Sequence, residues 1–322
     1  MKLSLIKLFS LLLNINSLIL STMSSSMFMI WMTLEMNLMS FIPLMKILNI
    51  STSNSMMKYF IIQALSSSML LLSIILNSKD NFNILMLSFI SLWLKLGMFP
   101  FQSWFFNISL YLTWNLWLML NTSQKIISLW SMNFFLVPQN QMMTFIIMNA
   151  LYSTIEIFNQ NSIRWMINAS SLNHMSWLLT LPSFSSNMWM IYMTIYIILM
   201  MMLNSFLKLN NMLSMYSSLN FKNFKNNLML MILMINFMGM PPMIGFLMKL
   251  LVLKTNKMVY VNMSLMMMTI THCYMYLNMC KQMMISMSMK TYINQMYNNY
   301  MMTIFYSMTI FYMSYYILLN YK

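Results

Sequence analysis

Apolar stretches long enough to span a membrane recur along almost the whole chain, and short clusters of Asn, Ser and Lys separate them. An α-helix needs roughly 20 such residues to cross the hydrocarbon core of a bilayer. Only 6% of the residues are charged, whereas soluble domains average about 25%. The sequence therefore predicts an all-α polytopic membrane protein with about eleven transmembrane helices and almost no domain outside the membrane.

The polar clusters divide the apolar stretches into separate expected helices. We expect them at 3–23, 26–46, 57–77, 83–105, 110–132, 141–158, 162–181, 187–207, 228–253, 259–280 and 301–319. The first stretch follows Lys2 and Lys7, as in a signal peptide, but no A-x-A-like cleavage site appears before Ser24. We therefore expect it to remain in place as the first membrane helix.

Two of the apolar stretches contain residues that interrupt a helix. These residues are Gly97, Pro100, Gly239, Pro241 and Pro242, and all three glycines of the chain lie at these two places. Proline lacks a backbone N–H and disfavours the helical conformation of the residue before it. Inside a membrane, irregular backbone is tolerated only where protein or water satisfies the freed polar groups. The sequence predicts that the fourth and ninth helices are broken beside an internal polar path.

The two predicted breaks occupy equivalent places in an expected internal repeat. Helices one to five (about 1–132) and six to ten (about 141–280) would each be broken at the fourth member, with one C-terminal helix (about 301–319) following. Because five is an odd number, the second repeat would enter the membrane from the opposite face. The sequence thus predicts two inverted five-helix repeats, as in many transporters, within a single transmembrane domain.

Five titratable side chains lie inside the predicted spans, namely Glu35, Lys95, Lys125, His174 and Lys249. A charge at membrane depth costs a few kcal/mol or more, so such residues are candidates for a functional site. Each also has a structural interpretation, as a buried ion pair, a snorkelling lysine or a hydrogen-bonded core histidine. Burial disfavours a charged amine and a nearby carboxylate favours it, so a movement of Glu35 relative to Lys95 can load or unload a proton. We expect these residues to form a proton relay.

The remaining polar residues predict no cofactor or metal site. Asp80 and Glu156 lie near helix ends, where we expect them to be solvated or at interfaces. Cys273 and Cys280 lie seven positions apart on one predicted helix, which is too far for a disulfide. Two Cys and two His do not suffice for an iron–sulfur or haem site. Any redox chemistry is therefore expected in a partner.

The net charge of +14 is spread between the apolar stretches and forms no basic stripe, so a nucleic-acid partner is not expected. Basic residues gather on the side of the N-terminus, which the positive-inside rule places inside. The use of 51 Met beside three Gly indicates a code that avoids GC-rich codons and reads AUA as Met, as many mitochondrial codes do. The sequence predicts a matrix N-terminus and a C-terminus in the intermembrane space.

Several of these segments carry a resemblance, and they are Trp31–Asn37, Lys95–Phe101, Gln124–Lys125, Ser170–Trp177 and Gly239–Pro242 with Lys249. In this order they resemble the subunit 2 family of animal mitochondrial NADH dehydrogenase, complex I. Beyond about residue 255 the resemblance rests on hydropathy alone. Three positions depart from the family's usual residues, namely Gln102, Trp165 and Ser176.

The resemblance implies an antiporter-like, proton-translocating subunit in the mitochondrial inner membrane. It implies that Glu35 is the family's key glutamate and that Lys95, Lys125 and Lys249 are the lysines of two half-channels and their connecting axis. The implied partners are other membrane-arm subunits and phospholipids. NADH, FMN, iron–sulfur clusters and ubiquinone are implied elsewhere in the complex, with none bound by this chain.

Two other functions remain open from the residues alone. A self-standing cation/proton antiporter would transport ions when reconstituted alone and would usually need a carboxylate site beyond Glu35. A structural spacer of a membrane arm would use its buried charges only to hold helices together. Replacing Lys95 by Met in an assembled complex tests the spacer hypothesis.

Overall fold

The computed structural model describes residues 2–48, 53–76, 82–134, 139–158, 162–181, 187–210, 224–240, 243–256 and 258–288. Within these ranges the regular secondary structure is helical. The expected C-terminal helix at 301–319 lies outside the described residues, as do Pro241 and Pro242. The all-α prediction is confirmed for the part of the chain that can be described.

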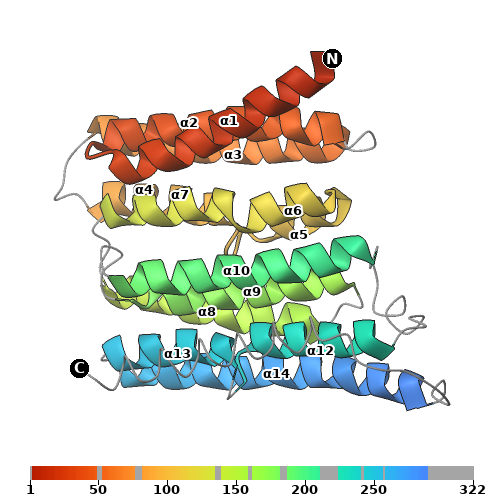
Figure 1. Cartoon of the computed structure of the whole chain (residues 1–322). Helices are drawn as coiled ribbons and strands as arrows, with labels where there is room; N and C mark the ends of the chain where they lie inside the picture. Colours follow the sequence, from red (N-terminus) through yellow and green to blue (C-terminus); the bar gives the residue numbers. More distant parts are fainter. Residues whose placement is uncertain are drawn as a thin grey trace.

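The helices lie roughly parallel and stack in four rows that follow the order of the sequence (Figure 1). The first row contains α1 (Lys2–Met23), α2 (Met27–Leu48) and α3 (Ser53–Leu76). The second contains α4 (Phe82–Leu96), α5 (Ser103–Tyr111), α6 (Trp114–Asn121) and α7 (Ser123–Ser131), which a short 3₁₀ turn, η1 (Met132–Phe134), follows. The third contains α8 (Gln139–Phe158), α9 (Ile163–Leu179) and α10 (Asn187–Leu209), and the fourth contains α12 (Phe224–Met238), α13 (Ile244–Thr255) and α14 (Val259–Ser288).

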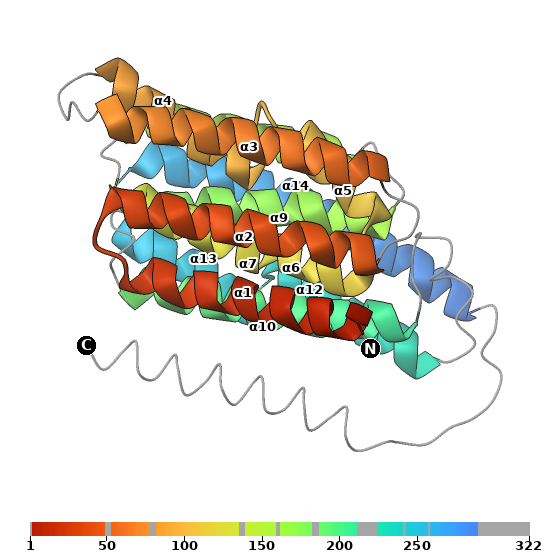
Figure 2. The same cartoon turned by 90° about the horizontal axis from the view of Figure 1, so that it is seen from above.

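The helices keep this near-parallel arrangement when the molecule is viewed from above (Figure 2). Four of the described helices contain spans long and apolar enough to cross a membrane, at Leu5–Met23, Met27–Lys46, Ser53–Leu76 and Met188–Leu209. Shorter apolar helices at Asn83–Leu96 and Met229–Met238 belong to the spans that are interrupted. A line of residues that passes from the first row of helices to the fourth therefore crosses the helix axes. Such a line runs parallel to the plane of the membrane.

The two predicted interruptions are present in the structure. The fourth span ends as α4 at Leu96 and resumes as α5 at Ser103, and the ninth ends as α12 at Met238 and resumes as α13 at Ile244. Gly97 and Gly239 begin the breaks with φ angles of 66° and 73°, which only glycine adopts at low cost. The prediction of broken fourth and ninth helices is confirmed.

The fifth span differs from its prediction as one helix over 110–132. It begins at Trp114 and is divided at Thr122 into α6 and α7. Three consecutive side chains, from Asn121, Thr122 and Ser123, donate to backbone carbonyls four residues earlier. Such side-chain bonds compete with the helical backbone bonds and bend helices. The prediction of one continuous helix was wrong. The apolar character of the stretch does not show that its short polar side chains bond the backbone and divide the helix.

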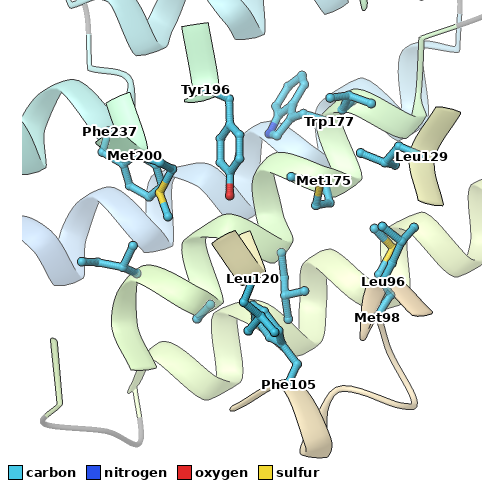
Figure 3. Packing of buried hydrophobic residues seen from close by; sticks show 14 of the residues in the cluster. Leu96, Met98, Phe105, Leu120, Leu129, Met175, Trp177, Tyr196, Met200 and Phe237 are labelled. Atoms are coloured by element: carbon cyan, nitrogen blue, oxygen red, sulfur yellow. The ribbon is translucent and has the colours of Figure 1, made fainter. Parts of the chain in front are cut away.

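Apolar side chains fill the space between the broken helices. Leu96 and Met98 at the first break pack in the same cluster as Phe105 of α5 and Leu120 of α6, and Met175 of α9 lies close by (Figure 3). Tyr196 and Phe237, from α10 and α12, border the same region. Gly97 and Gly239, which begin the two breaks, are therefore buried within the protein.

Candidate functional site

Lys95 lies in the last turn of α4, immediately before the first break. Its side chain is buried and lines a small pocket, together with Tyr59, Gln63, Gln124 and residues of α2 and α7. The pocket has room for about one water molecule. The C-terminal end of a helix carries partial negative charge, which favours a cation there. The end of α4 therefore helps the membrane interior to accommodate the Lys95 amine.

Three buried or partly buried amides, Asn14, Asn37 and Gln124, connect the first two rows of helices beside this pocket. The Asn14 amide donates to Asn37 Oδ1 at 2.7 Å, and the amides of Asn37 and Gln124 exchange hydrogen bonds of 3.0 and 3.1 Å. The Tyr59 hydroxyl donates to Gln124 Oε1 at 3.0 Å. Gln124, a member of this amide cluster, immediately precedes Lys125 in α7. The cluster therefore ends one residue away from Lys125 along the chain.

Lys125 lies in the first turn of α7, just past the division at Thr122. Its Nζ donates to Ser171 Oγ of α9 at 2.9 Å and lies 3.4 Å from Asn121 Oδ1. The amine also stands 4.5 Å from the centre of the Phe105 ring, within the range of a cation–π contact. Lys125 therefore links the second row of helices to the third, and its described partners are uncharged.

His174 and Lys249 meet at the second break. The C-terminal end of α12 leaves backbone carbonyls without helical partners. His174 Nε2 lies 3.0 Å from the carbonyl oxygen of Phe237, and Lys249 Nζ donates to that of Met238. His174 Nδ1 lies 3.0 Å from the Tyr192 hydroxyl of α10. Both side chains are buried, so Lys249 does not snorkel to the membrane surface.

Glu35 is less enclosed than the sequence predicted. It lies at the edge of the buried face of α2 and is partly exposed, whereas Leu34 and Asn37 are buried and Met36 is exposed. Leu34, Asn37 and Leu38 of the same helix line the pocket of Lys95. The structure thus places Glu35 on the helix that borders this pocket and leaves the carboxylate accessible from one side of the chain.

The predicted residues of the second half lie on α7, α9 and α13, and both His174 and Lys249 bond carbonyls at the end of α12. The five predicted residues therefore occupy all four rows of helices, on α2, α4, α7, α9 and α13. The predicted side chains form a row that crosses the subunit instead of separate local sites.

Polar side chains form hydrogen bonds with backbone groups that the first break leaves without helical partners. The Phe99 N–H donates to Asn149 Oδ1 at 3.1 Å, and Asn149 Nδ2 donates to the Leu172 carbonyl at 3.0 Å. The indole of Trp104 donates to the Leu94 carbonyl at 3.2 Å. Asn149 thus fastens the break to α9, a role that its place in an apolar stretch did not suggest.

Other sequence expectations can now be placed. Glu156 accepts hydrogen bonds from Tyr152 and from the Trp165 indole, so it is a partly buried acceptor on α8. Of the two expected places for Glu156, solvated or at an interface, the structure shows the interface, between α8 and α9. Cys273 and Cys280 are free thiols. Among the described residues no group of three His, Cys, Asp or Glu could hold a metal ion.

The three positions that depart from the family's usual residues are polar or aromatic side chains within the protein. Gln102 is buried between the first break and α5, and its Oε1 has no hydrogen-bond partner among the described residues. Trp165 stacks on Phe106 as well as donating to Glu156. Ser176 donates to the carbonyl of Asn173 on its own helix. None of them displaces one of the five titratable groups.

Comparisons with known proteins identify the family to which the chain belongs. The family described as NADH:quinone oxidoreductase/Mrp antiporter, TM, matches residues 24–80 and 75–275 of the chain. A relative from Anopheles gambiae, named NADH-ubiquinone oxidoreductase chain 2, is 35% identical over 240 residues, which cover 70% of this chain and 69% of the relative. The ranges of the family match include both breaks and all five titratable residues.

Two solved structures share the fold. A chain of respiratory complex I from Thermus thermophilus has a TM-score of 0.72 at 14% identity, over 86% of this chain and 70% of that one. A chain of the membrane-bound sulfane sulfur reductase, an archaeal respiratory membrane complex, has a TM-score of 0.75 at 14% identity, over 97% and 73% respectively. With the sequence matches, the chain belongs to the NADH:quinone oxidoreductase/Mrp antiporter membrane family and, within it, to the NADH-ubiquinone oxidoreductase chain 2 proteins.

Proposed function

We propose that the chain is an antiporter-like membrane-arm subunit of NADH:ubiquinone oxidoreductase, and that Glu35, Lys95, Lys125, His174 and Lys249 carry protons through it. The observation that supports this role is that the five side chains occupy all four rows of helices. Polar groups lie around these side chains, in the pocket at Lys95, at Ser171 beside Lys125 and at the carbonyls that end α12.

The broken helices explain why lysine can be accommodated at these depths. Lys95 lies at the C-terminal end of α4, and Lys249 reaches the C-terminal end of α12. Both ends offer partial negative charge. An uncharged partner, such as the carbonyl that Lys249 binds, stabilises an ammonium less than a carboxylate does, so the Lys249 amine can give up its proton at a lower cost. A relay needs this property, whereas a structural ion pair does not.

The proposal also assigns a location and partners. The chain would lie in the mitochondrial inner membrane among other membrane-arm subunits and phospholipids, with its N-terminus in the matrix. NADH, FMN, the iron–sulfur clusters and ubiquinone would belong to other subunits. The two inverted repeats, about 1–132 and 141–280, would place the breaks in equivalent half-channels.

Lys249→Met in the assembled complex is the sharpest test, because α13 provides its own control. Lys249 is buried at the break, whereas Lys254 lies one to two turns further along the same helix and is exposed. We expect Lys249→Met to lower proton pumping and coupled NADH:ubiquinone turnover roughly tenfold or more, as the loss of a proton-transfer group usually does. Lys254→Met should leave both rates near the wild-type value.

Glu35→Gln and Lys95→Met extend this test to the other end of the row. Both should reduce pumping, while electron transfer from NADH to a hydrophilic acceptor remains nearly intact in the assembled complex. If all these variants assemble and pump normally, the buried charges serve only as a spacer. Ion flux by the purified chain alone in vesicles would instead support a self-standing antiporter.

A further inference from the structure

The two ring nitrogens of the buried His174 have different partners, one on α12 and one on α10. Nε2 lies 3.0 Å from the backbone carbonyl oxygen of Phe237, and Nδ1 lies 3.0 Å from the Tyr192 hydroxyl oxygen. A carbonyl oxygen can only accept, so Nε2 carries a hydrogen and donates it. In the neutral imidazole Nδ1 is then the bare nitrogen, and the Tyr192 hydroxyl donates to it. The two partners therefore determine which tautomer this histidine adopts.

The sequence after α12 explains why the Phe237 carbonyl is available. In a continuous helix it would accept from the N–H four residues further on, but residue 241 is a proline and has no N–H to donate. Pro242 likewise leaves the Met238 carbonyl without a helical partner, and Lys249 binds this carbonyl. The two prolines thus free the two carbonyls that hold the histidine and the lysine of the row.

Nδ1 is consequently the nitrogen at which His174 can gain and lose a proton. An imidazolium also carries Nε2–H, so the bond to the Phe237 carbonyl persists when the ring is protonated. The fully buried Tyr192 hydroxyl faces Nδ1, and a hydroxyl can either donate or accept. It donates to a bare Nδ1, and its oxygen accepts from a protonated Nδ1 once the O–H bond has turned away from the ring. One hydroxyl therefore serves both protonation states.

We propose that Tyr192 is a positioning residue of the relay, which keeps Nδ1 of His174 hydrogen-bonded both with and without its proton. One proton binds at Nδ1 and later leaves from the same atom, so imidazole and imidazolium alternate while Tyr192 keeps its own hydrogen. A buried polar atom without a partner costs free energy, and Tyr192 avoids this cost in both states. This inference rests on the proposed relay, because it concerns one member of that relay.

The next tyrosine on α10 provides a matched control. Tyr196 is fully buried one turn further along, and the centre of its ring lies 5.6 Å from that of the imidazole. Its hydroxyl, however, donates to the backbone carbonyl of Asn121 at 3.4 Å. Tyr192→Phe and Tyr196→Phe therefore remove the same group from the same helix beside the same histidine, but only the first removes a bond to a ring nitrogen.

The test measures proton pumping by the assembled complex relative to electron transfer from NADH to a hydrophilic acceptor. We expect Tyr192→Phe to lower this ratio roughly tenfold, because it leaves a buried ring nitrogen without a partner. Tyr196→Phe should pump like the wild type. His174→Gln, whose amide takes up no proton, should lower the ratio roughly tenfold or more.

The double variant Tyr192→Phe with His174→Gln shows whether the tyrosine acts through the histidine. If it does, the double variant pumps like His174→Gln alone, because the group on which Tyr192 acts is already absent. Two independent structural defects would instead multiply, to a loss of roughly a hundredfold. Multiplied losses would overturn the inference.

A measurement on the unsubstituted complex tests the tautomer directly. Infrared spectra of wild-type complex minus those of His174→Gln should contain the imidazole bands of the Nε2–H tautomer. Bands of the Nδ1–H tautomer would overturn the inference, whether or not the tyrosine variants assemble. Failure of Tyr192→Phe to assemble beside normal assembly of Tyr196→Phe would also overturn it, because the hydroxyl would then serve stability.

The outcomes separate this inference from the proposed relay. Normal pumping by Tyr192→Phe together with impaired pumping by His174→Gln would overturn the role of Tyr192 and leave the relay standing. Normal pumping by Tyr192→Phe, His174→Gln and Lys249→Met would overturn the relay itself.

Discussion

At the scale of single residues, the buried cations of this chain are held by dipoles and aromatic rings. Lys125 binds a hydroxyl and faces the Phe105 ring, and Lys249 binds a backbone carbonyl. Arg164 shows the structural counterpart, since its Nη1 donates to two carbonyls at the end of α5, each at 2.7 Å, and its guanidinium covers the Trp114 ring. Uncharged partners thus hold the structural Arg164 as well as the lysines of the proposed proton relay.

The glycine at the second break allows a close approach that no other residue permits. A Cβ atom at Gly239 would stand 2.6 Å from the Gly245 carbonyl oxygen, and the φ of 73° is unfavourable for other residues. We expect Gly239→Ala to cost about 1–2 kcal/mol for the backbone conformation, with the clash in addition. The thermal unfolding midpoint of the purified complex should fall, and less of the complex should assemble.

Met243→Ala is the matched control for this substitution. Met243 lies at the same break, and its φ of −80° is accessible to alanine. Equal stability of the Gly239 and Met243 variants would show that the break tolerates a side chain and that its geometry differs from the one described.

At the scale of helices, a break is stable only if its freed backbone groups find partners. Asn149 of α8 supplies one of them by accepting from the Phe99 N–H, and it joins the break to α9 by donating to the Leu172 carbonyl. Three half-helix ends, those of α4, α6 and α12, lie next to Lys95, Lys125 and Lys249 respectively. Interrupted helices and buried lysines therefore occur together in all three spans.

Asn149→Leu should destabilise the first break, because it leaves the Phe99 N–H unpaired and removes the bond from Asn149 to the Leu172 carbonyl of α9. Each unsatisfied buried group costs about 1–3 kcal/mol. We expect a lower unfolding midpoint and increased hydrogen exchange at residues 97–102. Met148→Leu, at the exposed neighbouring position, is the control and should change neither quantity. Unchanged exchange in Asn149→Leu would mean that another group satisfies the break.

Much of this arrangement could be predicted because its signals are local in the sequence. Glycine and proline within an apolar stretch identified two breaks, and the cost of burying charge identified the five titratable residues. The division at Thr122 was missed because its signal is three ordinary polar residues whose effect depends on which carbonyls they reach. The contact of Asn149 was missed because its partner Phe99 is distant in the sequence. The contact of His272 in α14 was missed for the same reason, since its partner Ser153 belongs to α8.

At the scale of the whole molecule, the charges at the helix ends predict an orientation in the membrane. Exposed Lys46 and Lys58 lie at the end of α2 and the start of α3, and exposed Lys208 lies at the end of α10. Alternating spans place these ends on one face, whereas Lys254 lies on the other. The positive-inside rule assigns the richer face to the matrix.

Cysteine labelling in intact inner-membrane vesicles tests this orientation. A membrane-impermeant thiol reagent should label Lys58→Cys from the matrix side and Lys254→Cys from the intermembrane side. Both positions are exposed at helix ends, so each serves as the control for the other. Labelling of Lys58→Cys from the intermembrane side would reverse the topology and with it the assignment of the two half-channels.

The bond between Lys249 and the Met238 carbonyl joins a titrating group to the end of a half-helix. A charged amine binds a carbonyl more strongly than a neutral one does, so protonation and the tightness of this helix end are thermodynamically linked. Such linkage is reciprocal. In the proposed relay, a displacement of α12 by a neighbouring protein would therefore change the proton occupancy of Lys249, and protonation of Lys249 would draw the end of α12 toward it. The same contact would couple helix movement to proton transfer in both directions.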